Sequence, residues 1–474
     1  MAEQVLRKMH LIGIGGTGMR PLAEIAHKQS YEVTGSDQSR SMNVERLLAE
    51  GIKVTIGHSP SNLPPKPCTI IISSAVKGDN PELKAAQDQG YPILHRSDLL
   101  KLLMEGKKAI CVSGTHGKTS TTAMLAYMLH ALGVDPSAAI GGELVGLEQA
   151  SFVGSGEYFV AECDESDGSF LKYDPYLSII TNIDLDHLDY YGDIEGLKTA
   201  FLAFLHKTDK DGTAIVGWDN AIVRELMTSF SGDKLAFGTR IGSEVRGTRF
   251  KSLGRTVSYE AVVNKTLIKG EAALVGKHNF QNILCCLSVA HALALDLTQA
   301  ARALSHYPGV ARRFSLMAEH KGVKIYDDYA HNPGKIRSCI EGARSAFPTE
   351  RILVIFQPHR YSRLETMYNE FMQSFGAADE VFVLPVYAAG ETSTKDFSPT
   401  RVAQDISEAS QVKASMYATE VLKTRLSPYS HYLQQLPTVL ITIGAGDVWR
   451  LSQEWKEFLH GPETEKKPPL KPKA

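Results

Sequence analysis

A glycine-rich segment near the middle of the chain contains the residue types that a protein needs to hold a triphosphate. Residues 114–119 have the sequence GTHGKT and lie between an apolar run and a helical pattern. Backbone N–H groups of such a loop can surround phosphate oxygens, while Lys118 neutralises them and the Thr119 hydroxyl ligates Mg²⁺. The loop is a shortened variant, because Val112 stands where a glycine is usual, and a simple tight turn is the alternative. We predict that ATP is bound by Gly114, Thr115, His116, Gly117, Lys118, Thr119 and Ser120.

Acidic and imidazole side chains that could share a magnesium ion with Thr119 follow two other apolar runs. The segment VAECDESD spans residues 160–167, and we choose Glu162 as its metal ligand. His187 ends the segment TNIDLDH and is the second candidate. A magnesium–nucleotide complex needs oxygen or imidazole ligands close to the phosphates. The alternatives are a solvated acidic loop and a structural histidine.

A second glycine-rich segment, GIGGTG at residues 13–18, follows an apolar run near the N-terminus. Asp37 closes the next predicted strand about 20 residues later, as in dinucleotide-binding proteins. Such a loop holds the diphosphate of NAD, FAD or any other nucleotide diphosphate, so it predicts a pyrophosphate rather than a hydride carrier. A structural glycine turn is the alternative. The residues that we assign to this ligand are Gly15, Gly16, Thr17, Gly18 and Asp37.

Two segments in the last third of the chain carry polar groups after apolar runs. FQPHRYSR, residues 356–363, places His359, Arg360 and Arg363 after the run ILVIF. The planar guanidinium group can donate two parallel hydrogen bonds, which suits a carboxylate ligand, and ordinary surface basic residues are the alternative. DDYAHNP, residues 327–333, is either a ligand loop or an Asx turn.

The elements that must position these groups alternate between strand and helix along the chain. This alternation predicts an α/β protein with parallel sheets. We expect three units, at residues 1–106, 107–309 and 310–460, followed by a proline- and lysine-rich tail at 461–474 that is predicted to be disordered. The helix after the GTHGKT loop is predicted to have an apolar stripe made of Met124, Leu125, Met128, Leu129 and Leu132.

The composition is that of an ordinary globular protein. Of 474 residues, 43% are hydrophobic and 22% are charged, and the net charge is −2. This balance argues against a dedicated nucleic-acid or membrane-surface binder, which needs a surplus of Lys and Arg. The six cysteines include no CxxC pair and are predicted to be reduced core residues. The N-terminal apolar run is too short for a secretion signal or a membrane span, so we expect a cytoplasmic protein.

Taken in order, these segments resemble those of the Mur ligases of peptidoglycan synthesis. The match spans residues 9–449 and is carried by GIGGTGM, GSD, SSAV, GTHGKTST, VAECDESDGSF, TNIDLDHLDYYG, GKHNFQN, GVARRF, DDYAHNP, FQPHRYSR and VYAAGE. The resemblance implies a Rossmann-like N-terminal domain for a UDP sugar, a central phosphate-loop ATPase domain and a C-terminal Rossmann-like domain. In this family the lactyl carboxylate of the sugar takes the γ-phosphate of ATP, and an amine then attacks the acyl phosphate. We therefore expect an ADP-forming ligase.

The resemblance also assigns roles to residues near the nucleotide. Glu162 and His187 correspond to magnesium ligands. The residues that lie where the family holds the adenine are His278, Asn279 and Asn282 of GKHNFQN. The residues that are similar to third-domain contacts to the nucleotide and the reaction centre are Arg313, Asp328 and His331.

Further roles concern the sugar nucleotide and the amino acid. Ser73 and Ser74 of SSAV join the expected UDP-sugar site. FQPHRYSR is similar to the members that add L-alanine to UDP-N-acetylmuramate, in which His359, Arg360 and Arg363 would grip the carboxylate of the amino acid. The expected catalytic residues are Lys118, His331 and Arg360.

Three alternatives stay open at this point. A relative that attaches a recycled tripeptide to UDP-N-acetylmuramate generally differs at FQPHRYSR. A non-catalytic module that senses UDP sugars is a rival from another class, and the presence of Lys118, Thr119, Glu162 and His187 speaks against it. An NAD-dependent oxidoreductase would leave the GTHGKT loop unexplained. The expected partners are UDP-N-acetylmuramate and L-alanine, with no nucleic acid and no membrane, in a monomer or a homodimer.

Overall fold

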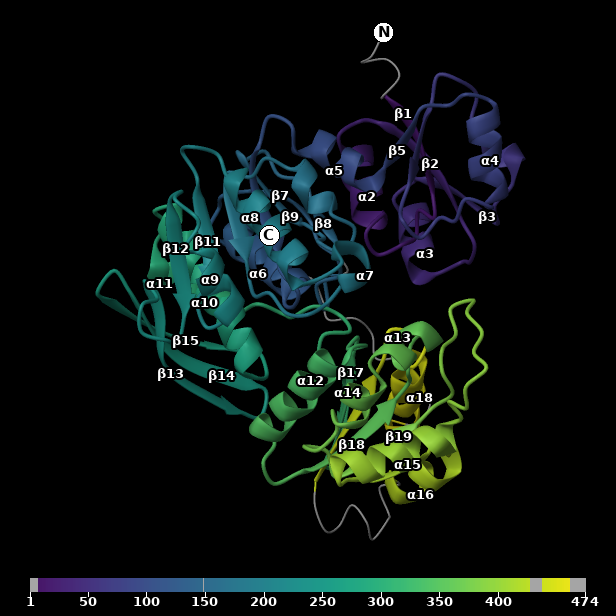
Figure 1. Cartoon of the computed structure of the whole chain (residues 1–474), viewed down its shortest axis with the longest axis vertical. Coiled ribbons are helices and arrows are strands. Elements are labelled where there is room, and N and C mark those ends of the chain that lie inside the picture. The colour runs from purple at the N-terminus through teal and green to yellow at the C-terminus, as the bar shows by residue number, and fades with distance from the viewer. Residues whose placement is uncertain (1–6, 148, 427–436, 461–474) are drawn as a thin grey trace, which may run out of the picture. The chain divides into compact units, whose positions relative to one another are not determined.

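The chain is organised in two compact units, which are described separately. The computed structural model describes residues 7–147, 149–426 and 437–460 (Figure 1). The first unit comprises Met1–Phe250, Ser258–Ala273 and Asn279–Gly309, and the second comprises Lys251–Val257, Leu274–His278 and Val310–Ala474. The described residues of these units form three sheets with helices between their strands, so the predicted α/β fold is confirmed.

The first sheet has five parallel strands in the order β3-β2-β1-β4-β5. The strands are β1 (Lys8–Ile12), β2 (Glu32–Asp37), β3 (Lys53–Ile56), β4 (Thr69–Ile72) and β5 (Ile93–His95). The helices are α2 (Arg20–Lys28), α3 (Met42–Ala49), η1 (Pro60–Asn62), α4 (Pro81–Asp88) and α5 (Arg96–Met104). Leu11 packs on the side of α2 and α5, whereas Ile12 packs on the side of α4, because successive strand residues face opposite ways. The GIGGTG loop leaves β1 where the strand order reverses, which is where open α/β sheets bind ligands.

The second sheet belongs to the first unit, apart from residues 251–253 of β13 and 256–257 of β14. It has ten strands in the order β15-β14-β13-β12-β11-β10-β6-β9-β7-β8. Its first strands are β6 (Lys108–Ser113), β7 (Ser137–Ala139), β8 (Ser151–Phe152), β9 (Tyr158–Glu162) and β10 (Leu177–Ile180). The later strands are β11 (Thr213–Gly217), β12 (Lys234–Gly238), β13 (Val245–Leu253), β14 (Thr256–Val263) and β15 (Thr266–Ala272). Strand β6 pairs in parallel with both β9 and β10, so the GTHGKT loop leaves the middle of the parallel region.

The prediction of a parallel central sheet is correct for its middle but not for its edge. Strands β7 and β8 pair antiparallel. Strands β13 to β15 follow one another with short turns and no intervening helix, and they extend the sheet beyond what the sequence analysis anticipated. Burial alternates residue by residue along β14, as expected for a strand with one solvated face.

Helix α6 (Lys118–Ala131) begins directly after the GTHGKT loop. The predicted stripe residues Met124, Leu125, Met128 and Leu129 are fully buried, but so are Ala123 and Ala126. Leu132 lies just beyond the helix end and is half-buried. Instead of a stripe, most of the helix surface is buried, since α6 packs against strands β6, β7 and β9 and also against α11 (Leu297–Ser305). The other helices of this region are η2 (Ser169–Lys172), α7 (Leu188–Tyr191), α8 (Ile194–His206), α9 (Ala221–Leu226) and α10 (Lys277–Ala292).

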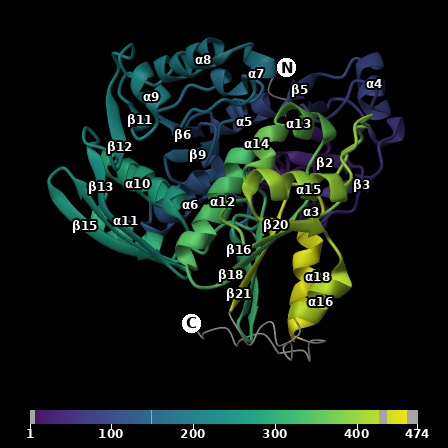
Figure 2. The ribbon, with the colours of Figure 1, turned by 60° about the horizontal axis from the view of Figure 1, so that its bottom comes forward.

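The second unit contains a six-stranded sheet in the order β16-β17-β21-β18-β19-β20. Its strands are β16 (Ser315–His320), β17 (Val323–Asp328), β18 (Arg351–Phe356), β19 (Glu380–Val383), β20 (Lys413–Met416) and β21 (Thr438–Ile443), and all pairs are parallel except β16 with β17. The helices are α12 (Pro333–Ala346), α13 (Tyr361–Thr366), α14 (Tyr368–Met372), α15 (Pro399–Ser410), α16 (Thr419–Leu426) and α18 (Trp449–His460). Alternate residues of β18 belong to two separate cores, one with α12 and α15 and the other with α18. Figure 2 shows the ribbons of these helices around the sheet.

Three further expectations concern the chain as a whole. All six cysteines are unpaired and buried, as predicted. None of the helices in the described part of the chain combines the length and the apolar character that a bilayer crossing requires. The tail at residues 461–474 lies outside the described residues.

A buried carboxylate connects several elements of the first sheet. Glu82 on α4 is fully buried and accepts hydrogen bonds from Ser36 at 2.9 Å and Asn62 at 3.0 Å, and its oxygen lies 2.6 Å from Nε2 of His10. Burial alone would raise the pKa of the Glu82 carboxyl, but the hydrogen bonds from His10, Asn62 and Ser36 lower it. The backbone carbonyl of Ser36 accepts from the N–H groups of residues 13 and 14. The network around Glu82 therefore supports the start of the GIGGTG loop.

Replacing Glu82→Ala should destabilise the first sheet by about 3–5 kcal/mol, because the buried His10 and Ser36 would lose their partner. The measurement is denaturant unfolding followed by circular dichroism. The matched control is Glu50→Ala, which removes a half-exposed carboxylate 3.7 Å from Lys28 and should change stability by less than about 0.5 kcal/mol. Equal effects of the two substitutions would contradict this account of Glu82.

Candidate active site

The GTHGKT loop has a backbone conformation that depends on its glycines. Gly114 and Gly117 have φ values of +123° and +86°, which favour glycine. A Cβ on Gly114 would lie 2.8 Å from the carbonyl oxygen of Asn182 and would overlap the Thr181 hydroxyl. The absence of a side chain at Gly114 lets the loop pass directly against the residues that follow β10, and its absence at Gly117 lets the loop approach Asn282.

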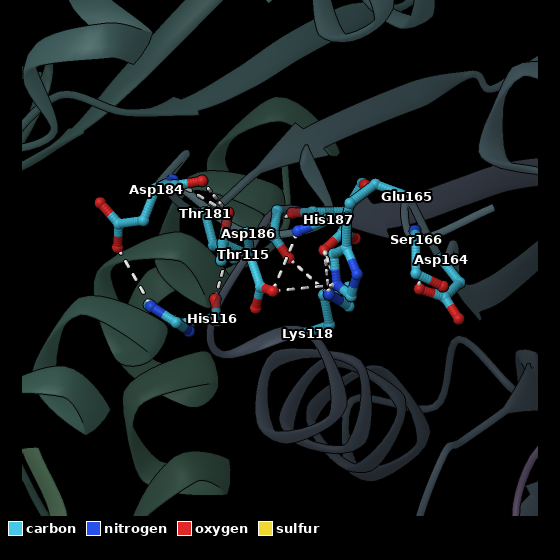
Figure 3. A network of polar contacts seen from close by, with 12 residues as sticks. Thr115, His116, Lys118, Asp164, Glu165, Ser166, Thr181, Asp184, Asp186 and His187 are labelled. Atoms are coloured by element: carbon cyan, nitrogen blue, oxygen red, sulfur yellow. Dashed lines mark hydrogen bonds and ion pairs between the residues drawn. The ribbon is translucent and has the colours of Figure 1, made fainter. Parts of the chain in front are cut away.

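The segment after β10 holds the loop in place through hydrogen bonds. The backbone N–H of His116 donates to Oδ1 of Asn182 at 2.9 Å, and Nδ2 of Asn182 donates back to the His116 carbonyl at 3.0 Å. The backbone N–H of Asp184 donates to the Thr115 hydroxyl at 2.9 Å, and the Asp184 carboxylate lies 3.1 Å from Nε2 of His116 (Figure 3). The hydrogen bond from His116 lowers the pKa of Asp184, despite partial burial. The sequence analysis did not identify Asn182 or Asp184, although both lie in the TNIDLDH segment.

Lys118 is the central cation of this site. Its Nζ donates to Oε1 of Glu165 at 2.7 Å and to the Gly114 carbonyl at 2.7 Å, and 13% of its side chain is exposed (Figure 3). Burial alone would lower the pKa of Lys118, but the carboxylates of Glu165, Asp164 and Glu162 raise it above its ordinary value. The ammonium group is therefore charged and held at the loop before any phosphate arrives. Sequence analysis missed Glu165, which lies three positions after the chosen Glu162.

The proposed magnesium ligands lie around the same loop. Glu162 ends β9 opposite Val112 of β6, and its Oε2 is buried without a hydrogen-bond partner among the described residues. Nε2 of His187 lies 4.0 Å from Oε1 of Glu165. Across residues 7–147, 149–426 and 437–460, no three His, Cys, Asp or Glu side chains are grouped as a complete metal site. Mg²⁺ is usually held by one or two carboxylates together with phosphates and water, and the Glu162 carboxylate is a ligand of that kind.

The helix α10 brings two of the expected adenine contacts to the loop. Asn282 accepts a hydrogen bond from the Thr121 hydroxyl at 3.1 Å and donates to Asn279 at 3.2 Å. A Cβ on Gly117 would lie 3.0 Å from Oδ1 of Asn282. Asn279 and Asn282 are thus close to the GTHGKT loop, whereas His278 is assigned to the second unit.

The GIGGTG loop carries the expected diphosphate contacts. The N–H of Gly15 donates to Oδ2 of Asp37 at 2.9 Å, and the Gly15 carbonyl accepts from Asn43 at 2.8 Å. Gly16 and Thr17 are exposed at the tip of the loop. Asp37 is therefore occupied in holding the loop, and the Gly16 N–H donates to the Gly13 carbonyl at 3.1 Å. The N–H groups of Thr17 and Gly18 are the ones left for a ligand.

The acidic segment after β9 also reaches the first sheet. Ser73 and Ser74 follow β4, and the Ser74 hydroxyl donates to Oδ2 of Asp167 at 2.9 Å. Nη2 of Arg96 donates to Oδ2 of Asp164 at 3.0 Å. These contacts place the expected sugar-nucleotide residues beside the segment that contains Glu162.

In the second unit, the DDYAHNP segment combines an Asx turn with a helix cap. Asp328 accepts hydrogen bonds from the N–H groups of Ala330 at 2.7 Å and Phe314 at 2.8 Å, and Asn332 accepts from the N–H of Lys335 at 2.9 Å at the start of α12. Both alternatives for this segment are compatible with that geometry, since an Asx turn can also carry ligand contacts.

Two adjacent arginines, Arg312 and Arg313, lie near the DDYAHNP segment. Arg312 lies 3.2 Å from Asp327 and donates to the Gly444 carbonyl at 2.8 Å. Both Arg312 and Arg313 lie over the Tyr329 ring, which also contacts the His331 ring edge-to-face. Burial, followed by the nearby Lys335 and Arg363, lowers the pKa of His331 well below its ordinary value.

The FQPHRYSR segment holds His359 between an aromatic ring and an arginine. His359 stacks on Tyr387, with ring centroids 5.4 Å apart, and its Nδ1 lies 3.2 Å from Nη1 of Arg363. Arg360 is exposed with a φ of +66° at the start of α13. Burial and the two arginines lower the pKa of His359 to about 4. The segment therefore presents two guanidinium groups beside a neutral imidazole, a set suited to a carboxylate.

Comparison with known proteins gives a consistent result over nearly the whole chain. Three sequence families match in order: Mur ligase family, catalytic domain at residues 8–108, Mur ligase middle domain at 112–290, and Mur ligase, glutamate ligase domain at 312–442. A UDP-N-acetylmuramate–L-alanine ligase of Carboxydothermus hydrogenoformans is 38% identical, covering 94% of this chain and 96% of the relative, and one of Sorangium cellulosum is 37% identical, covering 94% of each. The crystal structure of a UDP-N-acetylmuramate-alanine ligase from Thermotoga maritima superposes with a TM-score of 0.81 at 29% identity, covering 96% and 100% of the two chains.

Gly114→Ala should lower turnover by about 100-fold, because the added Cβ would push the loop away from Thr181 and Asn182 by a fraction of an ångström or more. The matched control is Gly133→Ala, which has a φ of +74° but no atom within 4 Å of the new Cβ. This control should cost about 1 kcal/mol of backbone strain and leave turnover unchanged. Phosphate release and denaturant unfolding would be measured for both variants. The loop geometry would be contradicted if Gly114→Ala kept its turnover, whether or not Gly133→Ala lost it.

The stability of the second unit should fall as the pH is lowered from about 6.5 towards 4. The pKa of His359 is lowered in the folded chain to about 4 from an ordinary value of 6.5, so the unfolded chain takes up the proton first as the pH falls. His359→Gln should make the dependence of unfolding free energy on pH shallower within this window. Denaturant unfolding at several pH values measures the effect, and an unchanged slope would show that the imidazole titrates alike in both states.

Proposed function

The chain belongs to the Mur ligase family, and from this membership we infer that it is an ADP-forming ligase that uses ATP to join L-alanine to UDP-N-acetylmuramate. The relatives that share more than a third of its residues over nearly the full length carry this activity in their names. The observation that supports the proposal within the molecule is the charged Lys118 in the GTHGKT loop, which interacts with the carboxylate of Glu162. One oxygen of that carboxylate has no hydrogen-bond partner within the described part of the chain.

The first role of the chain in this reaction is to hold the triphosphate of ATP. The N–H groups of residues 114–120 and the N-terminus of α6 surround phosphate oxygens, and Lys118 exchanges the carboxylate of Glu165 for a phosphate oxygen. Asn279 and Asn282 lie beside the loop and hold the adenine together with His278. Thr119, Glu162 and His187 would hold Mg²⁺, which neutralises the charge between the phosphates and an approaching carboxylate.

The second role is to bring two anions together. The diphosphate of the sugar nucleotide is bound by the loop that Asp37 holds, through Gly15, Gly16, Thr17 and Gly18. Ser73 and Ser74 contact the same sugar nucleotide. The lactyl carboxylate oxygen attacks the γ-phosphorus, ADP leaves, and the product is an acyl phosphate. A carboxylate is a poor electrophile until this step, and the positive charge of Lys118 lowers the repulsion that opposes it.

The third role is to present the amino acid. His359, Arg360 and Arg363 hold the carboxylate of L-alanine, and Arg313, Asp328 and His331 act at the nucleotide and the reaction centre. The neutral amine attacks the carbonyl carbon of the acyl phosphate through a tetrahedral intermediate, loses a proton, and inorganic phosphate leaves. His331 and His359 have lowered pKa values, owing first to burial, so both imidazoles are neutral near pH 7. Either one is chemically able to accept that proton, and His331 is our choice.

The proposal includes three domains and a cellular location. We place the sugar-nucleotide domain at residues 1–106, the ATPase domain at 107–309 and the amino-acid domain at 310–460. Both nucleotide substrates are made inside the cell, so the enzyme acts in the cytoplasm, as a monomer or a homodimer. The tripeptide-recycling reaction is the second candidate, since those enzymes share the sugar nucleotide and the fold.

Purified protein with ATP, Mg²⁺ and UDP-N-acetylmuramate should release phosphate when L-alanine is supplied, and not when the tripeptide is supplied. Lys118→Ala should lower kcat/KM by at least about 100-fold, because it removes the cation that stabilises the transferring phosphoryl group, while leaving the binding of UDP-N-acetylmuramate nearly unchanged. The control is Lys210→Ala, which removes a lysine whose side chain is 88% exposed. Phosphate release with the tripeptide alone would refute the alanine assignment, and equal loss of turnover and sugar-nucleotide binding in Lys118→Ala would refute the division of roles.

A further inference from the structure

Arg96 lies at the edge of the first sheet where the expected sugar-nucleotide residues gather. It is the first residue of α5 and directly follows β5, which pairs in parallel with β4. A capping box formed by His95 and Asp98 fixes the start of this helix. Because the carboxyl ends of parallel strands share one edge, Arg96 lies on the same side of the sheet as the GIGGTG loop and Ser74.

The guanidinium group of Arg96 lies between two functional segments. A Cβ built on Gly18 would lie 3.4 Å from its Nη1 and 3.8 Å from its Cζ, so the group packs against the last glycine of the GIGGTG loop. On its other side, Nη2 donates to Oδ2 of Asp164 at 3.0 Å. The side chain is 19% exposed, which leaves it accessible to a ligand.

The partner of Arg96 belongs to the segment that also holds Lys118. Asp164 and Glu165 are adjacent in sequence, and each forms an ion pair with a different cation, Arg96 and Lys118 respectively. Arg96 is therefore positioned between the loop expected to hold a diphosphate and the lysine expected to hold the γ-phosphate.

We propose that Arg96 binds an oxyanion of the sugar nucleotide and aligns it toward the ATP loop; this inference rests on the proposed function. A guanidinium group has five N–H donors in a planar fork that matches phosphate and carboxylate oxygens. Asp164 takes one of these donors, and in the described part of the chain no acceptor is paired with Nε or Nη1 of Arg96. Nη1 lies next to Gly18, faces the loop and is placed for a ligand on it.

Two oxyanions of UDP-N-acetylmuramate pass this position. The diphosphate lies on the GIGGTG loop beside Gly18, and the lactyl carboxylate has to travel from the first sheet to the phosphate at Lys118. Both share the chemistry that an arginine fork recognises. Ligands that contain one or both groups separate these two sources.

The rival explanation is that Arg96 only connects the two sheets of the first unit through Asp164. Such partly exposed ion pairs contribute little to stability, about 0–1 kcal/mol. The same helix offers a matched comparison, because Lys101 forms an equivalent ion pair with Asp174 at 3.0 Å, away from the GIGGTG loop. If Arg96 only connects the two sheets, substitutions of Arg96 and Lys101 should have similar effects on sugar-nucleotide binding. If Arg96 binds the ligand, only its substitution should weaken that binding.

The test is calorimetric binding of UDP, UDP-N-acetylglucosamine and UDP-N-acetylmuramate to the full chain without ATP. Arg96→Gln should weaken UDP-N-acetylmuramate by about 10- to 100-fold, the loss expected for a hydrogen-bonded charged group. Loss with all three ligands identifies the diphosphate as the bound group, and loss with UDP-N-acetylmuramate alone identifies the carboxylate. Arg96→Lys, which keeps the charge without the planar fork, should weaken the same ligands by a smaller factor.

The control is Lys101→Gln, which should leave binding of UDP-N-acetylmuramate within about twofold of the unaltered chain. The proposal is overturned if Arg96→Gln binds all three ligands normally, or if Lys101→Gln matches its loss. Thermal unfolding checks that each variant is folded, and Arg96→Lys with unchanged affinities overturns the proposal even if Arg96→Gln does not fold. Failure of the unaltered chain to bind UDP-N-acetylmuramate would instead refute the proposed function.

Discussion

The ion pair between Lys118 and Glu165 is the constraint around which the central site is built. A lysine with little exposed surface needs a counter-charge to remain protonated, and Glu165 supplies it at 2.7 Å. Burial raises the pKa of Glu165, and the charge of Lys118 opposes that change. The ion pair holds the Lys118 side chain at the GTHGKT loop. The lysine therefore loses little further conformational entropy when phosphate binds. The glycines at 114 and 117 serve the same end, because they let the loop approach Thr181 and Asn282.

The acidic segment after β9 distributes its carboxylates among several neighbours. Glu165 holds Lys118, Asp164 holds Arg96, and Asp167 holds the Ser74 hydroxyl, while one oxygen of Glu162 has no partner among the described residues. Three of these carboxylates therefore fix the segment and its surroundings, although Oε2 of Glu165, like Oε2 of Glu162, has no hydrogen-bond partner among the described residues. A short run of adjacent acids thereby connects the ATP loop to the first sheet, which is the connection that a phosphoryl transfer between two bound substrates requires.

Sequence reasoning identified the features that are local in the chain and missed those that depend on distant contacts. The GTHGKT and GIGGTG loops were found because strand, glycine turn and helix follow one another directly. Glu165 was overlooked in favour of Glu162, since only the fold shows which acid reaches a lysine 47 positions away. Asn182 was missed for the same reason, and the strands β13 to β15 were missed because no helix separates them. The apolar stripe of α6 was too narrow a prediction, because residue spacing does not reveal that strands and a second helix surround it.

The position of Ser36 links the integrity of the first sheet to the shape of its loop. The hydroxyl of Ser36 belongs to the buried network of Glu82, whereas its carbonyl anchors the N–H groups that begin the GIGGTG loop. A ligand that binds only the ordered form of the loop also stabilises the closed form of the Glu82 network, because the two equilibria are thermodynamically linked. Amide hydrogens of β1 and β2 would then exchange with solvent more slowly when the loop is filled. Ligand binding at the exposed loop would thus change the hydrogen exchange of buried strands that lie beneath it.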